Sequence, residues 1–223
     1  MKKKHRILLL CNLLLFLTGY IQAQNFGRLT TRKLGKSAPE YEDCKNFRVT
    51  IGGGYAYWLG ENQNTGNSSL NQFSSDLRHG YNLEAEAQYY FHEYMGVGLN
   101  TNFVKHSKDE MNRLGIKETD KMLFVGPTFN FRYESGKWGV YSGLGLGAIF
   151  YNGNVTLESA HATIKHTNFG LNYGISGEYK LNKTVGAGIK LSYTVGSFKI
   201  DNTDDKFSVS NLIITGFISF ITK

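Results

Sequence analysis

The strongest constraint in this sequence is an alternation of apolar and polar residues that repeats along most of the chain. In the segment from Tyr81 to Phe91, every odd position is apolar or aromatic, whereas the even positions are Asn, Glu, Glu, Gln and Tyr. Successive side chains of a β-strand point to opposite faces, so this segment is predicted to be a strand with one apolar and one polar face. After Ala23 there is no run of 18 apolar residues, and a transmembrane helix is therefore not expected.

Seven more segments show the same alternation. They are residues 47–58, 95–103, 121–133, 138–150, 166–179, 185–195 and 208–222. The last is the least regular, because Ile213 and Phe217 fall on its polar face. The composition also suits strands, with 26 Gly, 14 Tyr and 15 Phe but only 2 Pro, and with 19% charged residues against about 25% in an ordinary soluble domain. The sequence thus predicts an all-β fold of eight strands.

The connections between these segments are of two kinds. Short turns at 92–94, 134–137 and 181–183 alternate with longer polar connections at 59–79, 107–118, 153–161 and 199–206. Outer-membrane barrels have an even number of antiparallel strands, short periplasmic turns and longer extracellular loops. We therefore expect an eight-stranded antiparallel up-and-down transmembrane β-barrel. Pro127 lies inside one strand, where it removes a ladder hydrogen bond, and a local bulge is expected there.

A soluble barrel of the lipocalin kind is the main alternative, and it differs in burying its apolar face inside. In this chain the polar faces are small and rich in Gly, which suits a narrow lumen, and the apolar faces carry the larger side chains, which suits surrounding lipid. Aromatic residues also gather near both strand ends, as the two interfacial girdles of a membrane barrel do. They are Phe47, Tyr89, Phe91, Tyr133, Trp138 and Tyr179 near the short turns, and Tyr55, Tyr57, Tyr81, Phe103 and Phe150 near the long loops.

The first 23 residues have the layout of a secretory signal peptide. Three lysines and Arg6 precede an apolar core from Ile7 to Leu17, and a short stretch ends at Ala23. Removing these four cations, with no acidic residue among them, lowers the formal net charge from +7 to +3. Neither this charge nor export favours nucleic acid as a partner.

The mature chain is expected to have two parts, a periplasmic N-terminal arm at residues 24–45 and the barrel at residues 46–223. A single cysteine, Cys44, is left after cleavage, so no internal disulfide can form. An unpaired thiol is favoured over an intermolecular bridge.

Several runs give this chain a likeness to a known group. They are the signal end at Ala23-Gln24, Gly-Gly-Gly-Tyr at 52–55, Gly-Leu-Gly-Leu-Gly at 143–147, and an aromatic C-terminal strand through Phe220, which three residues follow. The chain resembles the small eight-stranded outer-membrane barrels of the OmpA and OmpX type. It is more specifically similar to the outer membrane protein beta-barrel domain proteins common in Bacteroidetes, including the PorT-like family. The resemblance implies an integral protein of the bacterial outer membrane, in contact with outer-membrane lipid and lipopolysaccharide.

The interior of an eight-stranded barrel is just wide enough for side chains to fill. Six charged residues are expected to point inward, namely Arg48, Glu84, Glu86, Arg132, Glu178 and Lys190. Buried charges are tolerated when they are paired and hydrogen-bonded. We therefore expect these three cations and three anions to interlock as a plug, for which Gly96, Gly98, Gly143, Gly145 and Gly170 make room. A narrow ion path lined by the same residues is the alternative.

No catalytic, cofactor-binding or metal-ligating residues are predicted. The segment His166-Thr167-Asn168, with Glu178, is similar to the His-x-Ser-Asn segment and carboxylate of the outer-membrane lipid A deacylases. However, Asn168 stands where the serine nucleophile belongs, and the alternation points His166 inward. The histidines lack the close spacing of a zinc pair, and residues 201–212 lack the Gly and Glu of a calcium loop.

Two functions remain open at this point. The first is a non-enzymatic structural or adhesion-type barrel whose long loops, 59–79 above all, contact something outside the cell. The second is a small pore, or a component of an envelope transport or assembly complex whose partners bind the N-terminal arm. Pattern alone identifies neither ligand nor partner.

Overall fold

The computed structural model describes residues 46–60, 72, 74–108, 116–157, 160–199 and 206–222. The predicted signal peptide and N-terminal arm, Cys44, and residues 201–205 lie outside the described residues, as does most of the 59–79 connection. No helix in the described ranges is both long and apolar enough to cross a membrane.

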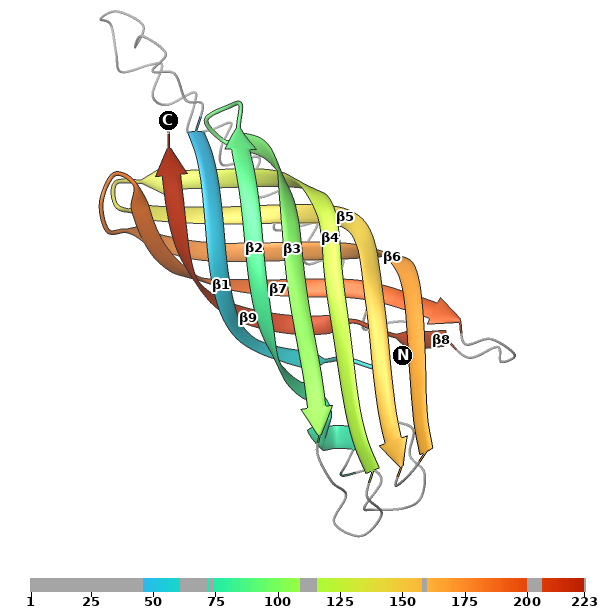
Figure 1. Ribbon diagram of the computed structural model, residues 1–223. Coiled ribbons are helices and arrows are strands. Elements are labelled where there is room, and N and C mark those ends of the chain that lie inside the picture. The colour runs from blue at the N-terminus through green and yellow to red at the C-terminus, as the bar shows by residue number, and fades with distance from the viewer. Residues whose placement is uncertain are drawn as a thin grey trace, which may run out of the picture. The chain divides into compact units, whose positions relative to one another are not determined.

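The described chain forms nine strands, arranged around a ring (Figure 1). They are β1 (Asn46–Trp58), β2 (His79–Tyr90), β3 (Met95–Lys108), β4 (Ile116–Ser135), β5 (Trp138–Leu157), β6 (Ala160–Lys180), β7 (Val185–Lys199), β8 (Lys206–Ser208) and β9 (Asn211–Thr222). Every pairing is antiparallel, and each of β1 to β7 pairs with its sequence neighbour. β9 pairs with both β7 and β1, which closes the ring, while β8 adds only three residues to the end of β7. The predicted eight-stranded up-and-down barrel is confirmed.

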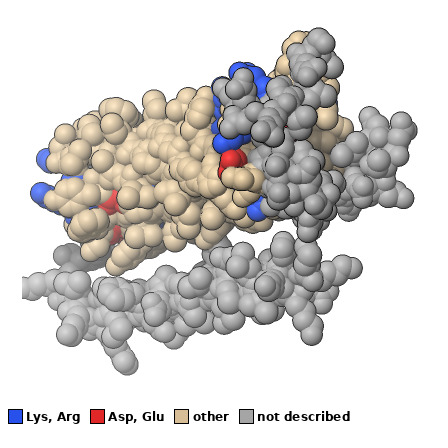
Figure 2. Space-filling model, turned by 90° about the horizontal axis from the view of Figure 1, so that it is seen from below, with Lys and Arg blue, Asp and Glu red and all other residues tan. Residues whose placement is uncertain are grey.

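The two faces of the wall differ as the alternation predicts. Along β2, Asn82, Glu84 and Glu86 are buried inside, whereas Leu83 keeps 58% of its surface exposed on the outside. Figure 2 shows a wide belt without charged side chains between the charged residues near the two ends. A wall with an apolar outside and a polar inside is the arrangement of a membrane barrel and the reverse of a lipocalin.

The strands extend further at the loop end than the sequence predicts. β3 pairs with β4 as far as Lys108↔Glu118, and β5 pairs with β6 as far as Leu157↔Ala160, so much of the predicted 107–118 and 153–161 loops is strand. These segments carry polar residues on both faces. They were predicted to be loops because a strand in the membrane is expected to have one apolar face toward lipid. A sheet that stands in water on both sides has no such requirement. We call the part of the barrel wall beyond the predicted loop-end girdle the extension. It consists of residues 105–108, 116–121, 151–157 and 160–167.

Two local details correct the sequence interpretation. The pairing of β4 with β5 skips Gly126 and Pro127 and resumes at Thr128↔Gly145, with two residues skipped on each strand. The expected bulge at Pro127 is therefore wrong, because the proline interrupts the ladder without inserting an extra residue. The last predicted strand, 208–222, is divided into β8 and β9.

Candidate functional site

The lumen is the candidate site, because the structure places all six charged residues predicted to point inward inside the barrel. Arg48, Glu84, Glu86, Arg132, Glu178 and Lys190 are each at most 8% exposed. Five of them fall into two clusters, one around Arg48 and one around Lys190. The sixth, Arg132, lies nearer the short turns.

The first cluster ties β1 to β6 across the lumen. The Arg48 guanidinium donates to Oε2 of Glu178 from Nη2 at 2.5 Å and from Nε at 3.0 Å. Its Nη1 donates to Oε1 of Gln88 on β2 at 2.7 Å. The guanidinium carbon also lies 4.0 Å from the centre of the Tyr141 ring. Arg48 thus connects strands β1, β2, β5 and β6.

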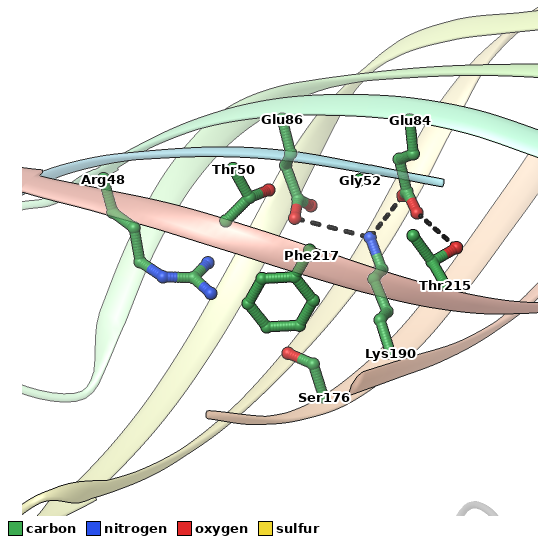
Figure 3. A pocket seen from close by; sticks show the side chains of 9 residues that line it. All are labelled: Arg48, Thr50, Gly52, Glu84, Glu86, Ser176, Lys190, Thr215 and Phe217. Atoms are coloured by element: carbon green, nitrogen blue, oxygen red, sulfur yellow. Dashed lines mark hydrogen bonds and ion pairs between the residues drawn. The ribbon is translucent and has the colours of Figure 1, made fainter. Parts of the chain in front are cut away.

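The second cluster ties β7 to β2 (Figure 3). Lys190 Nζ lies 2.6 Å from Oε1 of Glu84 and 3.3 Å from Oε2 of Glu86. Glu84 also accepts hydrogen bonds from Asn100 at 2.6 Å and from Thr215 at 3.3 Å. One ammonium group therefore bridges two carboxylates that share a face of β2.

Phe217 of β9 lies between the two clusters in Figure 3 and is 7% exposed. Its ring centre is 5.4 Å from the guanidinium carbon of Arg48. The sequence singled out Phe217 and Ile213 as irregular, but both point inward in register with Thr215 and Ser219. β9 is thus a regular strand whose inner face is partly apolar.

At the turn end a third group of side chains continues the network. The guanidinium carbon of Arg132 lies 4.3 Å from the centre of the Tyr90 ring, and its Nε donates to the backbone oxygen of Glu93 at 2.8 Å. The Tyr141 hydroxyl donates to Glu134 at 2.6 Å, and Glu134 is also ion-paired with Lys180. Tyr90 was assigned to the polar face of its strand, and its burial agrees with that assignment. Tyr141 was not singled out, although it has the phase of the polar face of its strand.

Glycines on the inner face leave the space that these side chains occupy. A Cβ added at Gly174 would lie 2.5 Å from Cε of Lys190, and one at Gly143 would lie 2.6 Å from Oδ1 of Asn130. A Cβ at Gly170 would lie 2.3 Å from Cδ1 of Ile149. These separations are shorter than ordinary van der Waals contact, so a side chain at any of these glycines would displace the inward side chain opposite it.

The loop half of the lumen contains a buried cluster of apolar side chains, which was not predicted. The buried cluster consists of Ala56, Val104, Met122, Phe124, Ile149, Phe198, Val209 and Ile213. Val209 lies between β8 and β9, and the other members have the phase of the polar face of their strands, as Val104 follows Asn100 and Asn102. Continuing that phase to the strand ends would have located them. A polar inner face was expected along the whole length of the barrel.

Two histidines of the loop end contact neighbouring lumen side chains. The ring of His166 stacks on Phe198 at 4.2 Å between ring centres, and His106 shares a hydrogen bond of 2.9 Å with Asn211. No group of three His, Cys, Asp or Glu residues in the described part of the chain is placed to hold a metal ion.

The predicted aromatic girdle residues lie on the outside of the wall. Phe47, Tyr89, Phe91, Tyr133, Trp138 and Tyr179 near the turns, and Tyr55, Tyr81 and Phe150 near the loops, are all exposed, while Tyr57 and Phe103 are half-buried. Trp138 and Tyr179 contact each other edge to face at 5.0 Å. Between the two sets, the exposed side chains are aliphatic residues and Phe, such as Leu99 and Leu144.

Comparison with known proteins agrees with this geometry. A sequence model of the outer membrane protein beta-barrel domain matches residues 34–215. The outer membrane protein OprG from Pseudomonas aeruginosa superposes with a TM-score of 0.54 at 15% identity, over 79% of this chain and 95% of that chain. Neisserial surface protein A gives 0.50 at 12% identity, over 79% and 96%. At such identities the two structures share the fold with this chain. No curated protein sequence matches it.

Proposed function

Because this chain belongs to the outer membrane protein beta-barrel domain family, and is thus an integral protein of the bacterial outer membrane, we propose that it is a non-enzymatic, closed barrel that presents its extension outside the cell. The main support for this proposal is that two different layers of side chains occupy the lumen, one after the other along the barrel axis. A charged layer occupies the turn half and an apolar layer the loop half.

The charged layer supports closure because its members are held by partners on other strands. Lys190 reaches across from β7 to β2, and Arg48 reaches from β1 to β6. Desolvated charges in such a setting stay paired, since separating them leaves an uncompensated charge in a low-dielectric interior. A permeating ion would have to displace these contacts.

The apolar layer supports closure for a different reason. Phe124, Ile149 and Ile213 have no exposed surface, and they belong to one buried apolar cluster. Hydrophobic constrictions exclude water and thereby block ions even when they are not fully occluded. An ion that passed the charged layer would still meet this barrier.

The orientation in the membrane follows from the two ends of the barrel. Short turns at 92–94 and 181–183 join strands at one end, and the extension stands at the other. Since short turns are periplasmic in this class of barrel, the extension faces the outside of the cell. It is the part of the wall available for contact with the surroundings.

Planar-bilayer recording with purified protein tests the closed barrel. Protease protection verifies independently that the protein is inserted. The inserted wild type is expected to give no steady open-channel current. A Lys190→Ser, Glu84→Ser, Glu86→Ser variant loses the Lys190 cluster of the charged layer but is expected to stay closed. Adding Phe124→Ser and Ile149→Ser is expected to produce conductance. Steady currents from the wild type would support the small-pore function instead.

A further inference from the structure

The outward face of the extension has an unusual distribution of charge. Its described outward residues include four lysines, one histidine and several hydroxyl and amide side chains, but no carboxylate. They are Lys105, Ser107, Lys117, Thr119, Lys121, Asn152, Asn154, Thr156, His161, Thr163, Lys165 and Thr167. The two carboxylates of β4 in this region, Glu118 and Asp120, lie on the inward face, where Asp120 accepts a hydrogen bond from Tyr151 at 2.6 Å.

Two of these lysines are direct cross-strand partners. Lys105 of β3 is opposite Lys121 of β4, Lys121 is opposite Asn152 of β5, and Asn152 is opposite Lys165 of β6. Like charges directly opposite each other on one face destabilise a sheet. None of these three lysines forms an ion pair with a carboxylate that the structure describes. The arrangement therefore calls for an anion from outside the chain.

The depth of these lysines indicates where that anion comes from. Lys105 lies two residues beyond Phe103, and Lys121 two residues beyond Leu123, whose cross-strand partner is Phe150. Two residues of strand are about 7 Å. Aromatic girdles lie at the level of the lipid headgroups, so the ammonium groups stand at that level or just above it. Figure 2 shows Lys and Arg side chains gathered next to the uncharged belt at the loop end, with acidic side-chain atoms beside them.

We propose that Lys105, Lys121 and Lys165 form a binding site for the phosphate groups of a phosphorylated glycolipid headgroup in the outer leaflet. The three side chains lie on strands β3, β4 and β6, so Lys121 and Lys165 are about 10 Å apart across the sheet. Ammonium groups at that separation can meet more than one phosphate. The neighbouring Thr and Asn side chains offer hydrogen bonds to sugar hydroxyl groups.

The location of this site at the cell surface depends on the orientation of the barrel given under the proposed function. The binding of phosphate groups by the three lysines does not depend on it. The binding assay therefore uses purified full-length mature protein in detergent. Native mass spectrometry measures the affinity for diphosphoryl lipid A and for the same glycolipid after dephosphorylation. Orientation is tested separately, by amine labelling of intact cells, so that a failure of either idea can be recognised.

The decisive variant is Lys105→Gln, Lys121→Gln, Lys165→Gln. Each cation near a charged lipid surface contributes about fivefold, so the triple variant is expected to bind diphosphoryl lipid A about a hundredfold more weakly. The matched control is Lys137→Gln, Lys183→Gln at the turn end, which is expected to leave the affinity unchanged. A gel shift between heated and unheated samples verifies that every variant is folded.

Three results would overturn the site. They are equal affinity of the triple variant and the wild type, equal affinity of the wild type for the dephosphorylated glycolipid, and an equal loss in the turn-end control. Titration with inorganic phosphate alone separates the remaining sources. An affinity for inorganic phosphate as high as that for diphosphoryl lipid A would mean that the site binds free phosphate and not a lipid headgroup.

Discussion

At the scale of single residues, the paired charges of the lumen are the groups whose loss the barrel tolerates least. The Arg48 and Glu178 side chains are 3% and 0% exposed, and each is the other's main partner of opposite charge. A buried pair of this kind adds little net stability compared with a well-packed apolar pair. Removing one member, however, leaves the other charged and desolvated.

The first prediction concerns this pair. Glu178→Gln is expected to lower the free energy of unfolding by about 3–5 kcal/mol, because Arg48 loses its counter-charge. The double variant Arg48→Met, Glu178→Met is expected to recover most of that loss. Urea unfolding of the barrel in lipid vesicles measures both. Glu134→Gln, which breaks the more exposed pair with Lys180, is the control and is expected to cost about 1 kcal/mol or less.

The second prediction concerns the turn between β4 and β5. Gly136 has a φ of 59°, in the left-handed region, where a Cβ costs roughly 1–2 kcal/mol. Gly136→Ala is expected to lower the free energy of unfolding by about that amount, although nothing lies within 4 Å of the new Cβ. Gly177→Ala also meets no atom within 4 Å and has no positive φ, so it is expected to be neutral. Equal effects of the two substitutions would contradict the backbone explanation.

At the scale of elements, β9 shows how the inner face changes polarity along one strand. Ile213 is fully buried in the apolar layer, whereas its neighbour Ile214 points to the lipid and is 50% exposed. The two residues are chemically identical, and they differ only in which side of the wall they occupy.

The third prediction uses this pair of isoleucines. Ile213→Ala is expected to cost about 2–5 kcal/mol, because it leaves a cavity among packed side chains. Ile214→Ala leaves no cavity, since lipid chains fill the space, and is expected to cost markedly less. Urea unfolding in vesicles again provides the measurement. A larger loss at Ile214 would mean that the assignment of inside and outside on β9 is reversed.

The fourth prediction concerns the extension as an element. Asn154 and Thr163 are directly opposite on β5 and β6, so a two-residue Asn-Gly turn can replace everything between them. The shortened protein is expected to fold and to keep its heat-dependent gel shift, because the removed residues lie beyond the membrane-facing wall. Failure to insert into vesicles would show that the extension is part of the barrel's folding core.

Sequence patterning predicted the elements well where one face meets lipid and the other the lumen. β2 and the lipid-facing parts of β3 and β5 follow the alternation, because burial differs sharply between odd and even positions. The pattern failed where that difference disappears. The ends of β4, β5 and β6 carry polar residues on both faces and were assigned to loops.

At the scale of the whole molecule, the charged residues of the lumen could be identified from sequence but their partners could not. The phase of Arg48 and Glu178 shows that both point inward, yet they are 130 residues apart and meet only because β1 and β6 face each other across the ring. That meeting depends on the register of all the strands between them. The apolar layer was missed for a related reason, since Ile149 and Phe198 become one cluster only in the closed barrel.

The central claim is that the odd positions of β2 face lipid and the even positions face a closed lumen. A spin-label scan of residues 82–87 in a Cys44→Ser background, with the protein reconstituted in bilayers, tests it most directly. Accessibility to dissolved oxygen is expected to alternate, with maxima at Leu83, Ala85 and Ala87 and minima at Asn82, Glu84 and Glu86. Maxima at the even positions, or no alternation, would contradict the membrane-spanning barrel described above.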